Sequence, residues 1–259
     1  MSETARQTPP ERPAARGLNE VALGVVSESV WWGLSFLGGL TVIFVLVLLT
    51  SIVTGEAETQ PAWLGIIGGP ILLGTAWACY RGLEALLVSK GDKSYAMVPE
   101  QRRLSVVTSL GAALGAITIA VMGSSLIGWV QAELIGIEIE EQAAIVELVA
   151  RGDAVELALL TLTAVVLAPL AEELLFREMF FRRLYHRTGL AAALIVPALA
   201  FAISHWNPVG LAVYAWLAVV FALTYLYTGR IFAAILAHAG HNAIVLAILV
   251  FGPESPLQP

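Results

Sequence analysis

Seven long runs of apolar residues constrain the fold of this chain more than any other feature of its sequence. A helix needs roughly 20 mostly apolar residues to cross the hydrocarbon core of a bilayer. The runs cover residues 30–54, 63–88, 104–130, 154–183, 190–206, 209–228 and 231–251. Hydrophobic residues make up 58% of the chain and charged residues 13%, and the mean hydropathy is +0.81. The sequence therefore predicts an all-α, polytopic transmembrane helix bundle with about seven spanning helices.

The segments that flank these runs predict the orientation and the domain plan. If the N-terminus is cytoplasmic, nearly all Lys and Arg residues outside the runs lie on the inner face, as the positive-inside rule requires. Residues 1–25 are polar and contain prolines, which predicts a disordered tail. Residues 26–252 would form the transmembrane domain, with a functional core at 154–251, and residues 253–259 a short C-terminal tail. We expect a multi-pass protein of the cell (plasma) membrane that contacts lipid and, lacking a basic patch, binds no nucleic acid.

Two other patterns have open interpretations. Residues 141–150, within an acidic segment, could form an amphipathic surface helix or a solvated loop, and the loop is favoured. The GxxxG spacings Gly65–Gly69 and Gly111–Gly115 could let neighbouring helices pack closely, although such pairs arise easily by chance in a glycine-rich chain.

Ionisable side chains inside a bilayer are expensive, so each one is a candidate for function. The first such place holds Glu172, Glu173 and Arg177. Neighbours on an α-helix point about 100° apart, so both glutamates should not face one site. Glu173 and Arg177, at i and i+4, are in the favoured order for an ion pair, which would leave Glu172 free to face a cavity. The alternative is that this segment marks the end of a span, with its charges in water.

Two further places carry histidines. His205 ends the fifth run, and Phe201, one turn earlier, could wall the same cavity. His238 and Asn242, at i and i+4, share one face of the last helix. Asn242 could therefore orient the His238 ring or donate its amide to a reacting oxygen. His241 is expected to point elsewhere.

These places lie at compatible depths in the membrane. Glu172 is 17 residues before Gly189, and His205 is 16 residues after it. If the two helices form an antiparallel hairpin, both side chains sit at nearly the same depth. His238 lies roughly 12 Å inside the last helix, at 1.5 Å per residue. Glu172, His205, His238 and Asn242 are thus expected to converge within the membrane.

A carboxylate and imidazoles in a sparsely hydrated cavity suit the activation of water. Glu172 would act as the general base, while His205 holds or polarises the water. His238 and Asn242 would donate hydrogen bonds to the oxyanion that forms from a peptide carbonyl. The expectation is a reaction without a firm cofactor. The alternative is a catalytic Zn²⁺ ion held by Glu172, His205 and His238, as a His₂Glu set with an open water position.

The three places resemble the motifs of the CPBP family, the CAAX-processing and bacteriocin-processing intramembrane proteases. The motifs E-E-x₃-R, F-x₃-H and H-x₃-N occur in order as Glu172-Glu173…Arg177, Phe201…His205 and His238…Asn242. The resemblance covers residues 157–250. It implies a peptidase whose first motif glutamate, Glu172, is the catalytic base, assisted by His205, His238 and Asn242, with Glu173, Arg177 and Phe201 in support.

The sequence therefore predicts an intramembrane endopeptidase that cleaves a membrane-associated protein or peptide. Two other functions use the same features. A non-catalytic scaffold or immunity factor would keep the bundle and tolerate substitution at all four catalytic positions. A proton-coupled transporter would use Glu172 and the histidines as a relay, but no repeated half is evident in the sequence.

Overall fold

The computed structural model describes residues 17–55, 62–87, 103–136, 143–151 and 153–252, and within these ranges the chain forms helices and turns but no strand. Six helical stretches there are long and apolar enough to cross a membrane. They are Leu18–Thr54, Ala62–Leu86, Val106–Ile135, Ala154–Thr188, Leu211–Thr228 and Ile231–Phe251. The all-α bundle is confirmed, and the chain is an integral, multi-pass membrane protein.

The helices of the described ranges follow in chain order. The first are α1 (Leu18–Thr54), α2 (Ala62–Leu87), α3 (Val106–Val130) with its π-helical end η3 (Gln131–Ile135), and α4 (Ala143–Arg151). A composite helix follows, made of α5 (Ala154–Leu162), η4 (Thr163–Leu167), α6 (Ala168–Glu172), η5 (Glu173–Phe181) and α7 (Arg182–Thr188). The last are α8 (Leu190–Ser204), α9 (Leu211–Thr228) and α10 (Ile231–Phe251).

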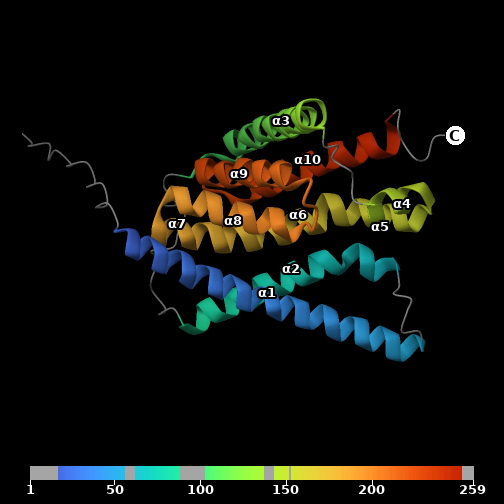
Figure 1. Ribbon diagram of the computed structural model, residues 1–259, viewed down its shortest axis with the longest axis horizontal. Helices are drawn as coiled ribbons and strands as arrows, with labels where there is room; N and C mark the ends of the chain where they lie inside the picture. Colours follow the sequence, from blue (N-terminus) through green and yellow to red (C-terminus); the bar gives the residue numbers. More distant parts are fainter. Residues whose placement is uncertain (1–16, 56–61, 88–102, 137–142, 152, 253–259) are drawn as a thin grey trace, which may run out of the picture.

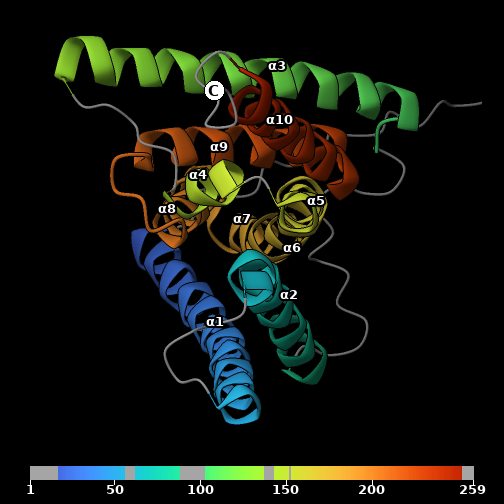
Figure 2. The same ribbon diagram turned by 90° about the vertical axis from the view of Figure 1, so that its right-hand side faces the viewer.

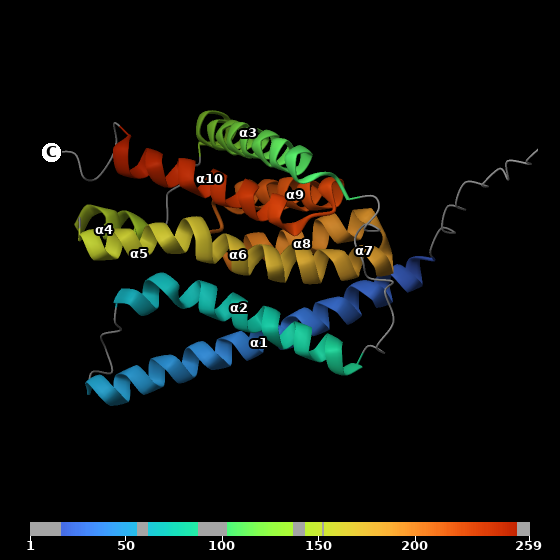
Figure 3. The same cartoon turned by 180° about the vertical axis from the view of Figure 1, so that it is seen from behind.

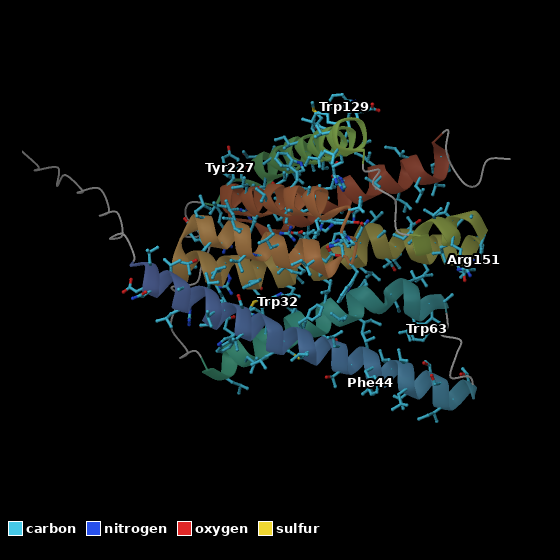
Figure 4. The ribbon with its side chains drawn as sticks, in the orientation of Figure 1. Trp32, Phe44, Trp63, Trp129, Arg151 and Tyr227 are labelled. Atoms are coloured by element: carbon cyan, nitrogen blue, oxygen red, sulfur yellow. The ribbon has the colours of Figure 1, made fainter. Side chains whose placement is uncertain are left out.

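The composite helix α5–α7 lies in the middle of the molecule. The paired helices α1 and α2 cover one side of it, and α9 and α10 cover the other, with α3 outermost beyond them (Figures 1 and 3). Seen from the end, α2 and α10 lie on opposite sides of α5 and α6 (Figure 2). Phe44 on α1 and Tyr227 on α9 point away from the bundle and are 66% and 68% exposed, as suits lipid-facing side chains (Figure 4).

Three observed elements differ from the expected ones. Helix α8 has only 15 residues and is not among the candidate spans, because it ends at Ser204 and the chain turns at Trp206, whose φ is 53°. Helix α1 begins at Leu18, so residues 18–25, which the sequence placed in the N-terminal tail, are helical; residues 1–16 lie outside the described ranges. The acidic segment does contain a helix, α4, where a loop was favoured.

The expected close packing at the GxxxG pairs is not observed. A Cβ atom added at Gly65, Gly69, Gly111 or Gly115 would meet no atom within 4 Å in the part of the chain that the structure describes. These glycines therefore do not form close contacts with another described helix.

Segment η5 forms the centre of the apolar core. Its side chains Leu175, Phe176, Met179, Phe180 and Phe181 are at most 1% exposed. Rings from other helices pack against them: Trp32 of α1 stacks on Phe180 with centroids 5.8 Å apart, and Phe201 of α8 meets Phe176 edge to face at 5.2 Å. A helix enclosed on all sides is positioned by all of its neighbours, so η5 has little freedom to shift.

A buried ionic network joins α1 to the end of the composite helix. Glu28 is fully buried and accepts hydrogen bonds from the hydroxyl of Tyr80 (2.7 Å) and from Nε and Nη2 of Arg183 (2.8 and 3.1 Å). Nε of Arg187 lies 2.8 Å from Oε1 of the same carboxylate. Glu28 was not predicted, because the first predicted span began at residue 30; an acidic residue shortly before that span, with Val26 and Val30 two positions away on either side, was the signal that could have revealed it.

Removal of this carboxylate should destabilise the fold. We expect Glu28→Ala to lower the free energy of unfolding by about 3–5 kcal/mol, because buried Arg183 would lose one of its two carboxylate partners, keeping Glu84, and the Tyr80 hydroxyl would lose its acceptor. The measurement is the unfolding midpoint in mixed detergent micelles. Thr41→Ala, an exposed α1 position whose hydroxyl bonds only to its own helix at Leu37, is the control and should stay within about 0.5 kcal/mol. Equal midpoints for both variants would contradict the prediction.

Candidate active site

The expected ion pair between Glu173 and Arg177 is present and buried. Nη1 of Arg177 lies 3.0 Å from Oε1 of Glu173, and the two side chains are 2% and 0% exposed. The guanidinium also sits over the rings of Phe201 and Phe221, 4.4 and 5.5 Å from their centroids. Desolvated cation–π contacts of this kind help to offset the cost of burying a charge.

The His238 ring lies between the two adjacent carboxylates. Its Nδ1 is 2.9 Å from Oε1 of Glu173, and its Nε2 is 3.8 Å from Oε2 of Glu172. The ring also stacks on Phe221, with ring centroids 4.6 Å apart and planes 19° from parallel. One imidazole thus reaches a different carboxylate with each of its nitrogens, while the two glutamates keep different surroundings.

Glu173 determines which nitrogen of His238 carries a hydrogen. A carboxylate can only accept, so Nδ1 donates to it, and Nε2 is the nitrogen directed toward Glu172. This is the arrangement in which a buried carboxylate fixes the tautomer and orientation of a working histidine.

His205 is held where α8 ends. Its Nδ1 lies 2.8 Å from the carbonyl oxygen of Phe201, so Nδ1 donates and Nε2 is left available. The ring stacks on Tyr214 of α9 at 4.0 Å and packs against Phe201 at 4.6 Å. Phe201 is 1% exposed and touches both histidines and Arg177, so it occupies the wall position predicted for it.

Asn242 makes a contact that follows from a break in the composite helix. In the π-turn η4 the amide of Ala168 donates to the carbonyl of Thr163, five residues back. In the same five-residue pattern, the carbonyl of Ala164 would accept a hydrogen bond from the amide of residue 169, but that residue is Pro169, which has no N–H. Nδ2 of Asn242 donates to the Ala164 carbonyl instead, at 2.9 Å. One hydrogen of the Asn242 amide is therefore already engaged.

The four predicted catalytic residues line one cavity of about 920 Å³. Glu172, His205, His238 and Asn242 all border it, as does Phe201. Glu173 and Arg177 do not, because they lie behind His238. Oε2 of Glu172 is buried and has no hydrogen-bond partner among the described residues. The two adjacent glutamates are thus separated into one that borders the cavity and one that is enclosed.

His241 also borders the cavity, contrary to expectation. Its Nε2 is 3.5 Å from the hydroxyl of Ser124 on α3, and its Nδ1 is 3.3 Å from Oδ1 of Asn242. The spacing of three residues from His238 on one helix was the signal for this placement. Tyr214, which stacks on His205, carried no comparable signal.

The side chains do not fit the zinc alternative. Within the ranges that the structure describes, no three His, Cys, Asp or Glu side chains are grouped so that they could hold a metal ion.

Residues 154–244 match the family model described as "Type II CAAX prenyl endopeptidase Rce1-like". The chain is 27% identical over 144 residues to the "Putative membrane peptidase YdiL" of Bacillus subtilis (strain 168), a match covering 55% of this chain and 57% of that one. It is 29% identical over 96 residues to the "Membrane-embedded CAAX protease MroQ" of Staphylococcus aureus (strain USA300), covering 35% and 39%. It thus spans less than two thirds of either relative's length. No solved structure is significantly similar.

The family match and both relatives agree with the geometry. The matched residues contain all three charged motifs, and the structure gathers those motifs around one cavity. Over residues 154–244 the chain is therefore similar to type II CAAX prenyl endopeptidases, and the two relatives are described as membrane peptidases or proteases.

Proposed function

We propose that this protein is an intramembrane endopeptidase that hydrolyses a peptide bond of a membrane-associated protein or peptide. The observation that carries the proposal is that the two adjacent glutamates have different surroundings. Glu172 borders the cavity, and its Oε2 has no hydrogen-bond partner among the described residues. Glu173 is enclosed with Arg177 and orients His238. The similarity of residues 154–244 to the CAAX prenyl endopeptidase model and the two similar membrane peptidases support the same reaction class.

In the proposed mechanism Glu172 removes a proton from a water molecule in the cavity. The oxygen of that water attacks the carbonyl carbon of the substrate peptide, and a tetrahedral oxyanion forms. Oε2 of Glu172 is suited to this role because no described residue forms a hydrogen bond with it. His205, whose Nε2 is available, would hold the same water.

His238 and Asn242 would stabilise the oxyanion. Two carboxylates and one guanidinium leave the cluster of Glu172, Glu173 and Arg177 with one excess negative charge. A proton on His238 brings the formal sum to zero, and Nε2 can then donate a hydrogen bond. The amide of Asn242 has a second hydrogen beyond the one given to Ala164. Preorganised donors of this kind are worth about 10²–10³ in rate each.

Collapse of the intermediate completes the reaction. The carbon–nitrogen bond breaks, and the proton that Glu172 took from water passes to the leaving amine. The products are a new carboxylic acid and a new amine, which exchange the remaining proton of the water to give a carboxylate and an ammonium group, and Glu172 returns to its charged form. The protein lies in a lipid bilayer. Because both similar peptidases are bacterial, the proposed location of this protein is the plasma membrane.

The first test is the substitution of Glu172. We expect Glu172→Gln to lower the cleavage rate of a quenched fluorescent peptide by about 10²–10⁴-fold, because the general base is lost. Its unfolding midpoint should stay near that of the wild type, since Oε2 has no partner within the described residues. The peptides tested should include lipidated and plain sequences.

Glu178→Gln is the matched control for this test. Glu178 lies on the same segment η5, accepts a hydrogen bond from Nε1 of Trp77 at 3.3 Å and does not border the cavity. It should retain normal cleavage. Full activity of a folded Glu172→Gln variant would remove Glu172 from the mechanism. Absence of cleavage by the wild type with every peptide would instead favour a non-catalytic scaffold.

The second test is removal of metal. Because Glu172 alone activates the water in this mechanism, a zinc chelator should leave the rate unchanged within experimental error. Loss of activity on chelation, with recovery when Zn²⁺ is restored, would show that Glu172, His205 and His238 rearrange into a zinc site.

A further inference from the structure

The cavity is larger than the catalytic group requires and extends along the bundle to α4. Beyond Glu172 it is bordered by apolar side chains, including Ile66 of α2, Leu148 of α4 and Leu160 of α5. Glu147 and Arg151 of α4 border its far end, which lies at the same end of the molecule as Trp63 (Figure 4). A space of this length, leading from the reactive carboxylate to charged side chains, is shaped to hold a chain and not only a single side chain.

One wall of this extension is a bare face of α2. Ala62, Gly65 and Gly69 border the cavity, and a Cβ atom added at either glycine would meet nothing within 4 Å. The face is therefore not filled by another described helix. A backbone can approach such a glycine face more closely than it can approach any other surface.

The opposite wall carries a buried hydroxyl without a partner. Thr163 is 6% exposed, borders the cavity, and its Oγ1 has no hydrogen-bond partner among the described residues. Other helical threonines of this chain, Thr161 and Thr224, donate to the carbonyl four residues back. A buried hydroxyl that lacks a partner is unfavourable, and a ligand that pairs with it removes that cost.

The separation of Thr163 from Glu172 sets the length of the ligand. Nine residues of helix separate them, or roughly 13 Å at 1.5 Å per residue. An extended peptide covers that distance in about four residues, at 3.3–3.6 Å each. Within a membrane the N–H and C=O groups of an extended peptide have no water to bond with, so they need polar partners from the protein.

We propose that this groove, between Gly65 and Gly69 on one wall and Thr163 on the other, binds an extended apolar segment of the substrate on one side of the scissile bond. The Thr163 hydroxyl pairs with a backbone group about four residues from that bond, and the glycine face admits the backbone. The inference rests on the proposed peptidase function and adds a substrate requirement: at least four apolar residues in an extended segment.

The test compares variants that fill or alter the groove. Gly69→Leu fills the space, and Thr163→Val removes the hydroxyl with little change of shape. With a peptide carrying six apolar residues on each side of the scissile bond, we expect kcat/KM to fall about tenfold or more for each variant, through KM and not kcat. Two shorter peptides are then compared, each cut to two residues on one side of the scissile bond. The peptide that has lost the segment bound in the groove should have the same kcat/KM with the variants as with the wild type.

Gly74→Leu is the matched control. Gly74 lies on the same helix, has open space around its Cβ position and does not border the cavity, so this variant should behave as the wild type. Binding provides a readout independent of catalysis. Fluorescence anisotropy in detergent measures the affinity of the long labelled peptide for the Glu172→Gln protein. The same measurement is made after Thr163→Val or Gly69→Leu is added to that protein.

The outcomes separate the two proposals. Weaker binding caused by the groove variants supports the groove even if no peptide is cleaved, in which case only the peptidase function fails. Unchanged binding and unchanged kcat/KM in folded groove variants overturn the groove and leave the peptidase function intact. Failure of the long peptide to bind the Glu172→Gln protein also overturns the groove.

Discussion

The buried contact of Glu173 with Arg177 and His238 is the interaction on which the rest of the site depends. Removing a carboxylate and a guanidinium from water is costly, and here the pair, the imidazole and the faces of Phe201 and Phe221 together compensate for it. These partners come from η5, α8, α9 and α10. The charges can be buried only when all four segments are in place, so the same interaction assembles the site and fixes the ring of His238.

The composite helix supplies the geometry that this contact needs. Its π-helical turns at η4 and η5 interrupt the α-helical pattern on both sides of Glu172. Pro169 leaves the Ala164 carbonyl without a helical donor, and Asn242 takes that role. At the other end, Glu28 ties Arg183 to α1, so η5 is held from both directions. Two adjacent glutamates on one continuous helix thereby acquire different surroundings and, in the proposed mechanism, different tasks.

The sequence was sufficient for the features that depend on composition and on short motifs. Apolar runs of sufficient length predicted the bundle, and the i, i+4 spacing predicted the Glu173–Arg177 pair, because both rules are local. The gathering of Glu172, His205, His238 and Asn242 around one cavity also followed from their depths in the membrane. Their catalytic roles stay predictions.

Other features depend on contacts between distant segments, which hydropathy does not report. The π-helical turns keep the same apolar composition as an α-helix, so the sequence did not reveal them or the contact of His238 with both glutamates. Glu28 has its partners, Arg183 and Tyr80, far along the chain. The shortness of α8 follows from the turn at Trp206, and the bare glycines of α2 follow from the cavity beside them.

The central claim is that Glu173 acts by orienting His238 while Glu172 carries out the chemistry. The most direct measurement is the cleavage rate of the double variant Glu173→Leu/Arg177→Met, in which both buried charges are removed together so that neither is left uncompensated and the fold is retained. The account predicts a folded protein whose kcat is at least about tenfold lower with KM little changed, because His238 has lost the carboxylate that fixes its ring. A folded double variant with the cleavage rate of the wild type would contradict it.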